Sequence, residues 1–135
     1  MGFCMGGALA LIGAQHSEHI VAAAPFYGIP GPDLFQPENL KTPVQGHFGA
    51  TDGHTGFSDP ESARALEAKL KAAGSEGEIF IYEGQGHAFL NETPWPYKTW
   101  EEREAAMNKG IKPHNAEVAA LAWGRVQAFF AKHLI

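Results

Sequence analysis

A cysteine flanked by glycines opens the chain, and this run constrains the fold more than any other stretch. Residues 1–7 read Met-Gly-Phe-Cys-Met-Gly-Gly. The spacing is typical of a nucleophile elbow, a sharp strand-to-helix turn that holds a reactive side chain, here Cys4, over the carboxyl end of a parallel sheet. We expect glycine at Gly2 and Gly6 because side chains there would collide in the strained turn. The backbone N–H of Met5 would open the helix and point at a developing oxyanion.

Composition narrows the class of protein and its partners. The chain has 135 residues, 44% of them hydrophobic and 19% charged, with a net charge of −5, which is ordinary for a globular domain. It has no basic run, so nucleic acid is not an expected partner. No apolar stretch approaches the roughly twenty residues that span a bilayer, so no membrane partner is expected. The single cysteine excludes an internal disulfide and fits a reducing compartment, which predicts a cytoplasmic location.

Segments typical of helices and of strands alternate along the chain. The first helix has almost no polar residue, which predicts a helix buried on nearly every side. The alternation predicts an α/β fold, with a parallel sheet of about three strands flanked by helices. In chain order we expect a helix at 5–15, strands at 20–26 and 44–50, a helix starting at Asp59-Pro60 and closed by Gly74, a strand at 78–83, a short helix within 98–109 and a helix at 115–133.

Three reactive side chains lie where this sheet would gather them. Cys4 sits in the elbow, Asp52 follows the strand at 44–50, and His87 follows the strand at 78–83. Parallel strands end at one rim, so we expect the three side chains to meet there. Their order of nucleophile, acid and histidine matches the α/β-hydrolase arrangement. A free thiol has a pKa near ~8.5 and attacks as a thiolate, so it needs a histidine base whose tautomer is fixed by a carboxylate.

Each of these side chains also has a plainer interpretation. A lone cysteine is commonly a small buried hydrophobe, Asp52 fits a simple turn, and a loop histidine often bonds only to backbone. The joint order favours the catalytic interpretation. We expect His47 to pack within the sheet because it lies mid-strand, and His54 is too close to Asp52 in sequence to face it readily. A zinc site from Cys4, His47 and His54 remains an alternative, but the spacing contains no familiar ligand pair.

Three motifs in this order resemble one known family. They are residues 2–7 (Gly-Phe-Cys-Met-Gly-Gly), 46–52 (Gly-His-Phe-Gly-Ala-Thr-Asp) and 86–91 (Gly-His-Ala-Phe-Leu-Asn), and the ending at 115–130 fits as well. Together they are similar to the dienelactone hydrolase (carboxymethylenebutenolidase) family of the α/β-hydrolase superfamily. The resemblance covers nearly the whole chain apart from residues 92–112.

The resemblance implies a role for each matching residue. Cys4 would be the nucleophile, Asp52 the triad acid and His87 the triad base. It implies hydrolysis of a small-molecule ester or lactone through an acyl-enzyme, with no metal or organic cofactor. Within the matching motifs, Phe3, Phe89 and Asn91 are the expected substrate-binding residues. Asn91 stands where enzymes specific for dienelactone place an arginine, and an amide has no bidentate cationic fork for a carboxylate.

The resemblance also predicts how the chain is organised. Residues 1–135 would form a partial α/β-hydrolase domain, the carboxyl-terminal half of the fold, beginning at the elbow. The first half of the fold would precede Met1 and contain the strand leading into Cys4 and the loop with the other oxyanion donor. The edge of the strand at 20–26 would then lie bare. An alternative hypothesis is therefore an inactive fragment that associates, with itself or a partner, through this open sheet edge.

Residues 92–112 form an insert between the histidine loop and the last helix. Trp95, Tyr97 and Trp100 give its first half an aromatic character. Two interpretations remain open for these side chains, a lid over the site and plain surface packing.

Overall fold

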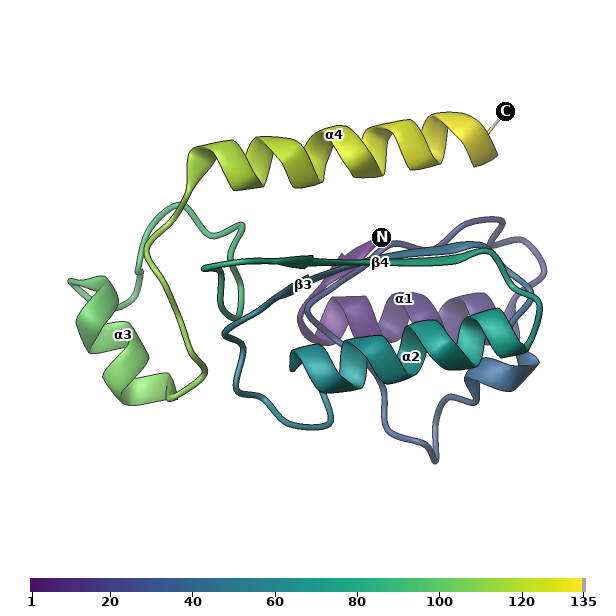
Figure 1. Ribbon diagram of the computed structural model, residues 1–135, viewed down its shortest axis with the longest axis horizontal. Helices are drawn as coiled ribbons and strands as arrows, with labels where there is room; N and C mark the ends of the chain where they lie inside the picture. Colours follow the sequence, from purple (N-terminus) through teal and green to yellow (C-terminus); the bar gives the residue numbers. More distant parts are fainter. Residues whose placement is uncertain (135) are drawn as a thin grey trace.

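A parallel sheet with helices on both faces organises the protein (Figure 1). The computed structural model describes residues 1–134. Its four strands lie in the order β1-β2-β3-β4 and all pair in parallel. The strands are β1 (Gly2–Phe3), β2 (Pro25–Phe26), β3 (Val44–Gly49) and β4 (Gly77–Tyr82). The helices are α1 (Met5–His16), α2 (Pro60–Ala72), α3 (Trp100–Met107) and α4 (Ala116–His133), with a 3-10 helix η1 (Pro37–Asn39). The expected α/β fold is confirmed.

The two faces of the sheet are covered by different helices. In Figure 1, α1 and α2 lie on one face, α4 lies on the other, and α3 lies beyond one end of the sheet. Leu11, Phe48 and Leu70 are fully buried between the sheet and the first two helices. Phe26 and Val126 belong to the second apolar cluster, under α4. Burying side chains of this size stabilises a fold by about 1.5–3 kcal/mol each, so both layers hold the sheet in place.

The expected strand at 20–26 is shorter than predicted. Ala23 and Tyr27 donate backbone hydrogen bonds to Pro43 and His47 across the sheet, but Pro25 between them has no N–H for the middle bond. The regular pairing is therefore limited to β2 and a single bridge from Ala23 to Val44. The sheet also has one strand more than expected.

The extra strand is β1, which pairs Gly2 with Pro25 and Phe3 with Phe26. The expectation of a bare edge on the segment at 20–26 is therefore wrong. The outer edge of β1 is the open one, since β1 ends the strand order of the sheet.

The expectation that α1 is buried on nearly every side is also wrong. Gly7 and Leu11 are buried, whereas Met5 is 62% exposed and Leu9 is 59% exposed. Only one face of the helix lies against the sheet. A Cβ on Gly7 would come within 2.7 Å of the Phe26 carbonyl oxygen, so the small residues allow a close approach on that face.

The other helices begin at the expected residues. Asp59 caps α2 by accepting from the Ser62 N–H, Pro60 takes the first helical position, and Gly74 follows the helix with a φ of 77°. Asn115 caps α4. The short helix α3 lies within the predicted 98–109.

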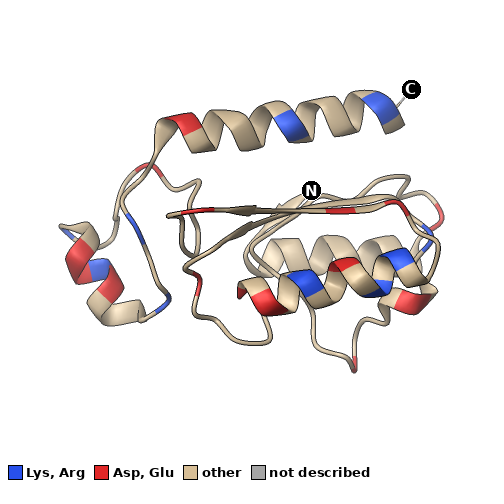
Figure 2. Cartoon of the chain, in the orientation of Figure 1, with Lys and Arg blue, Asp and Glu red and all other residues tan. Residues whose placement is uncertain are grey.

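Charges of both signs are spread over the outer helices. Figure 2 shows Lys, Arg, Asp and Glu interspersed along α2 and α3 and sparsely along α4, whereas α1 has none of these residues. Within residues 1–134, no helix combines the length and apolar character that crossing a membrane requires.

Candidate active site

Cys4 occupies the strained turn that the sequence predicts. It lies between β1 and α1 with φ 53° and ψ −121°, a conformation that residues other than glycine rarely adopt. Its N–H donates to the Phe26 carbonyl at 2.9 Å. A Cβ on Gly2 would overlap the carbonyl oxygen of Gly6, and one on Gly28 would overlap that of Cys4. The expected need for glycine is therefore met at Gly2, but it is wrong for Gly6, where a Cβ would meet open space.

We expect Gly2→Ala to lower the free energy of unfolding by about 1–3 kcal/mol, the usual cost of forcing a methyl group into filled space. The methyl group would push the first turn of α1 away from β1 and displace the thiol. Gly6→Ala is the matched control on the other side of Cys4. Alanine is the better helix former, so Gly6→Ala should leave stability equal or higher. Chemical denaturation of both variants measures the difference, and equal losses in both would contradict the steric argument.

The three side chains predicted for the site meet at one point. Cys4 Sγ lies 3.4 Å from His87 Nε2, and His87 Nδ1 lies 2.8 Å from Asp52 Oδ2. Cys4 comes from the turn after β1, Asp52 from the loop after β3, and His87 from the loop after β4. Asp52 and His87 are 3% and 5% exposed, so their contact is largely shielded from water. Such a row of thiol, imidazole and carboxylate can move a proton from sulfur to the ring while the carboxylate holds the ring in place.

Two residues of the loop after β3, Ser58 and His54, also lie beside the imidazole and its carboxylate partner. Ser58 is fully buried, and its Oγ lies 3.1 Å from His87 Nδ1. The backbone N–H of His54 donates to Asp52 Oδ1 at 2.9 Å, which leaves the other carboxylate oxygen for His87. The His54 ring lies edge-on to the His87 ring at 5.8 Å between centroids. Desolvation and the nearby Lys109 charge lower the pKa of His54. The contact of His54 with Asp52 is therefore made by its backbone N–H and not by its ring.

Tyr27 is a site neighbour that the sequence analysis missed. It follows β2 with a φ of 39° and is buried with its ring edge-on to that of His87, 5.4 Å away between centroids. Burial, aided by the neighbouring Cys4 charge, raises the pKa of Tyr27 well above its usual value, so the phenol keeps its proton. The available signal was its position directly after a strand, at the rim where the other site residues lie. Ser58 offered no comparable signal because it lies mid-loop.

The residues expected to bind substrate lie in three different settings. Phe3 is 40% exposed beside Phe26, with ring centroids 5.1 Å apart. Phe89 is buried and packs against Tyr27. Asn91 is exposed and lies against Arg103 of α3; with the amide oxygen toward the guanidinium, Oδ1 accepts from Nη2 at 3.0 Å and from Nη1 at 3.2 Å.

Met5, the expected oxyanion donor, is the first residue of α1. Its N–H belongs to the first turn of the helix, where no earlier helical carbonyl is available to accept it. Gly7 and Ala8 donate instead to the Cys4 carbonyl. The Met5 side chain is exposed to solvent.

His47 packs within the sheet, as expected, and has no hydrogen bond to Cys4, His87 or Asp52. Its ring is fully buried and stacks on Phe26 at 4.4 Å between centroids. Nδ1 lies 2.8 Å from the Tyr82 hydroxyl and Nε2 lies 3.1 Å from Gln45 Oε1. Burial, with the nearby Arg125 charge, lowers the pKa of His47 to about 3. Both ring nitrogens are engaged in hydrogen bonds, so His47 does not join Cys4 and His54 as a ligand set.

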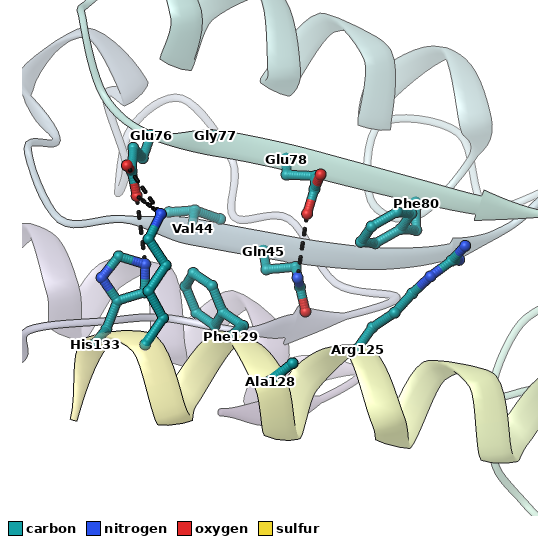
Figure 3. Close-up of a pocket in the computed structure, with 11 residues that line it drawn as sticks. Val44, Gln45, Glu76, Gly77, Glu78, Phe80, Arg125, Ala128, Phe129 and His133 are labelled. Carbon is teal, nitrogen blue, oxygen red and sulfur yellow. Dashed lines mark hydrogen bonds and ion pairs between the residues drawn. The ribbon is translucent and has the colours of Figure 1, made fainter. Parts of the chain in front are cut away.

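The polar side chains around His47 lead toward a hollow under α4. This cavity of about 460 Å³ lies between α4 and the strands β3 and β4 (Figure 3). Glu78 pairs with Gln45 on one wall, and Arg125 stacks over the Phe80 ring at 3.9 Å. Val44 and Gly77, the first residues of β3 and β4, also line it, so the hollow lies toward the amino ends of the strands, whereas Asp52 and His87 follow their carboxyl ends.

Solved structures with this arrangement define the class of fold. An α/β hydrolase from a deep-sea metagenome, MGS-M1, superposes with a TM-score of 0.56 at 16% identity over 96% of this chain and 50% of its own. A crystal structure described as a "putative dienelactone hydrolase" of Klebsiella pneumoniae gives a TM-score of 0.68 at 25% identity, over 98% of this chain and 50% of its own. The chain therefore has the fold of about half of an α/β hydrolase.

The sequence comparisons identify the family. The model of the dienelactone hydrolase family matches residues 1–134. A "putative carboxymethylenebutenolidase" of Yersinia pestis is 30% identical over 98% of this chain and 45% of its own length. The carboxymethylenebutenolidase of Rhodococcus opacus is 29% identical over 99% of this chain and 49% of its own length. The chain belongs to the dienelactone hydrolase family, which confirms the resemblance, and it spans about half the length of these curated relatives.

Proposed function

We propose that the protein is a cysteine-dependent hydrolase that cleaves an ester or lactone through Cys4, His87 and Asp52. Membership of the dienelactone hydrolase family supports a hydrolase function. The observation that carries the proposal is the position of the His87 ring, 3.4 Å from the thiol on one side and 2.8 Å from the carboxylate on the other. This geometry suits a thiol made nucleophilic by an oriented base.

The reaction proceeds in two halves on the same three side chains. His87 Nε2 takes the proton of Cys4 Sγ, and the thiolate forms an S–C bond with the substrate carbonyl carbon. The Met5 N–H stabilises the negative charge on the carbonyl oxygen. The C–O bond of the ester breaks, and the alkoxide takes the proton from His87.

Hydrolysis of the acyl-enzyme uses the same base. A water molecule gives a proton to His87 Nε2 while its oxygen bonds to the carbonyl carbon. The S–C bond then breaks, and the proton on His87 returns to the Cys4 sulfur. Asp52 accepts from His87 Nδ1 throughout and holds the ring in place.

For substrate recognition, Phe3 offers an exposed apolar surface beside the thiol turn. Asn91 contributes through its contact with Arg103, which brings a guanidinium to the segment that follows His87. Phe89 supports the site from within the core. We propose a small-molecule ester or lactone as the substrate of this surface.

An acyl group trapped on Cys4 tests the proposal directly. The protein is mixed with p-nitrophenyl acetate, quenched in acid at times from seconds to hours, and examined by intact mass and peptide mapping. We expect one acetyl group, on the peptide that contains Cys4, and none on Cys4→Ala. A folded wild-type protein whose thiol stays unmodified would overturn the proposal.

The second hypothesis, an inactive fragment that associates through an open sheet edge, has support of its own. The outer edge of β1 is unpaired in the described part of the chain. Three exposed apolar side chains lie near this edge: Phe3 on β1, Val21 just before β2, and Trp123 on α4. Edges of this kind pair readily with another chain. The acylation experiment separates the two hypotheses, because an inactive fragment leaves the thiol unmodified.

A further inference from the structure

The chain bends sharply after α3, at residues 109–111 (the 109–111 turn). Asn108 ends the helix in a left-handed conformation with φ 49°, and Gly110 has φ 68°. The Glu104 carboxylate holds the turn: Oε1 accepts from the Gly110 N–H at 3.1 Å and Oε2 accepts from the Ile111 N–H at 2.6 Å. Both carboxylate oxygens of a helix residue are thus used to fix a backbone that is not helical.

This 109–111 turn is bonded to the residues on both sides of Asp52. The Gly53 N–H donates to the Lys109 carbonyl at 3.1 Å. The Thr51 hydroxyl donates to the Gly110 carbonyl at 2.7 Å. A Cβ on Gly110 would overlap the Thr51 carbonyl oxygen, so the two backbones are in direct contact.

The loop that carries His87 meets the same turn. A Cβ on Gly86 would overlap the Gly110 carbonyl oxygen. The Thr51 N–H donates to the Gln85 carbonyl at 2.9 Å, and the Thr51 hydroxyl lies 3.0 Å from the same carbonyl. The loop that carries Asp52 (the acid loop), the loop that carries His87 (the base loop) and the insert therefore meet around Thr51.

We propose that the 109–111 turn, held by Glu104, is a clamp that sets the spacing between Asp52 and His87. Glu104 and Thr51 are positioning residues, acting on the triad through the backbone of Gly110. The inference rests on the proposed function, since it concerns how the thiol is activated. It assigns the insert a role as a brace between the two triad loops, and this role does not require Trp95 or Trp100 to cover the site.

The clamp affects thiol reactivity through a defined path. Cys4 reacts as a thiolate, which is stabilised by protonated His87, and that imidazolium is stabilised by Asp52 at 2.8 Å. If the acid loop moves away, the imidazolium loses its partner and less thiolate forms at neutral pH. A misplacement of about 1 Å can cost on the order of a hundredfold in rate. We expect a smaller effect here, about tenfold, because the two loops also bond to each other.

The test measures the alkylation of Cys4 by iodoacetamide from pH 5 to 10 in the 135-residue protein. For Glu104→Gln, which retains one acceptor oxygen, we expect the alkylation rate at neutral pH to fall by about threefold. For Glu104→Ala we expect a fall of about tenfold. In both variants the midpoint of the pH profile should shift to higher pH. Alkylation near pH 10 should match wild type. Glu101→Gln, an exposed site on the same helix, is the control and should leave the profile unchanged.

A second pair of variants keeps the test independent of the folding of the Glu104 variants. Thr51→Val removes the hydroxyl bonded to Gly110 at nearly constant shape, and Thr51→Ser restores it. The valine variant should show the shifted profile, and the serine variant should show that of wild type. If the wild-type thiol is alkylated readily at neutral pH and the pH profiles of Glu104→Gln and Thr51→Val are the same as that of wild type, the clamp is overturned. A wild-type thiol that reacts only at high pH would instead overturn the proposed function.

Discussion

Replacing Cys4 with alanine is expected to abolish ester turnover. Removing the nucleophile of a working triad costs on the order of 10⁶-fold in kcat, and a factor of that size corresponds to about 8 kcal/mol of transition-state stabilisation. The fold should be retained, because alanine keeps the Cβ in the same turn and the backbone N–H of residue 4 still donates to the Phe26 carbonyl. Steady-state hydrolysis of p-nitrophenyl acetate measures the loss, with circular dichroism to check the fold.

Cys4→Ser separates the chemistry of the nucleophile from its geometry. The serine hydroxyl would occupy the position of the thiol beside His87 Nε2, but a hydroxyl is far less acidic than a thiol and needs more help to form the anion. We therefore expect an activity between those of wild type and Cys4→Ala. His19→Gln, an exposed site on the loop after α1, should match wild type. Full activity in Cys4→Ala would show that the hydrolysis does not pass through this residue.

Local signals in the sequence were enough to place most of the helices. Asp59 and Asn115 cap their helices through contacts within three residues along the chain, and such short-range hydrogen bonds can be anticipated from residue type and order. The uniformly apolar α1 was harder, because composition does not indicate that only one face of a helix meets the sheet. The late start of β2, at Pro25 and not at residue 20, is explained by the missing N–H of Pro25, a signal that was present in the sequence.

The meeting of Cys4, His87 and Asp52 was predictable because it follows from topology. Parallel strands end at one rim, so the loops after β3 and β4 bring Asp52 and His87 to the thiol turn although 35 residues separate them along the chain. No such topological rule predicts the positions of Ser58 and of the 109–111 turn beside these residues. Thr51 and Gly110 are 59 residues apart, and their contact depends on how residues 92–112 fold back onto the loop that carries Asp52. Contacts set by the path of such a long segment cannot be predicted from motifs or periodicity.

His47 is expected to make the protein sensitive to acid. Its ring is neutral in the fold, with Nε2–H donating to Gln45 and Nδ1 accepting from the Tyr82 hydroxyl. Burial, with the charge of Arg125, lowers its pKa from 6.5 to about 3. Between these two pH values the unfolded chain binds a proton that the folded chain does not. Stability is therefore complete above pH 6.5, falls as the pH drops through this window, and loses no more to this residue below about pH 3.

The loss of stability caused by His47 is large compared with the free energy of unfolding of a whole domain, so it can be measured. A pKa lowered from 6.5 to about 3 corresponds to at most about 4–5 kcal/mol, whereas a domain is stable by about 5–15 kcal/mol in total. Burial alone would raise the pKa of Asp59, but hydrogen bonds from Ser62 and Gly56 outweigh it and lower this pKa, so stability is also lost at lower pH. The range from pH 6.5 to 5 excludes the carboxylates, but the pKa of His54 is also lowered, so the contribution of His47 is the difference in slope between wild type and a His47 variant.

Urea denaturation at intervals from pH 7.5 to 5 measures the prediction. The free energy of unfolding of wild type should fall by about 1.4 kcal/mol per pH unit toward the acid end of this range, the limit for one proton. His47→Gln preserves a hydrogen-bonding side chain but cannot be protonated, so its free energy should change less with pH whatever its absolute stability. His19→Gln, which removes an exposed histidine, should retain the wild-type slope. Equal slopes for wild type and His47→Gln would mean that the buried ring is protonated in the fold at mildly acid pH, in conflict with its packing between Phe26 and Phe80.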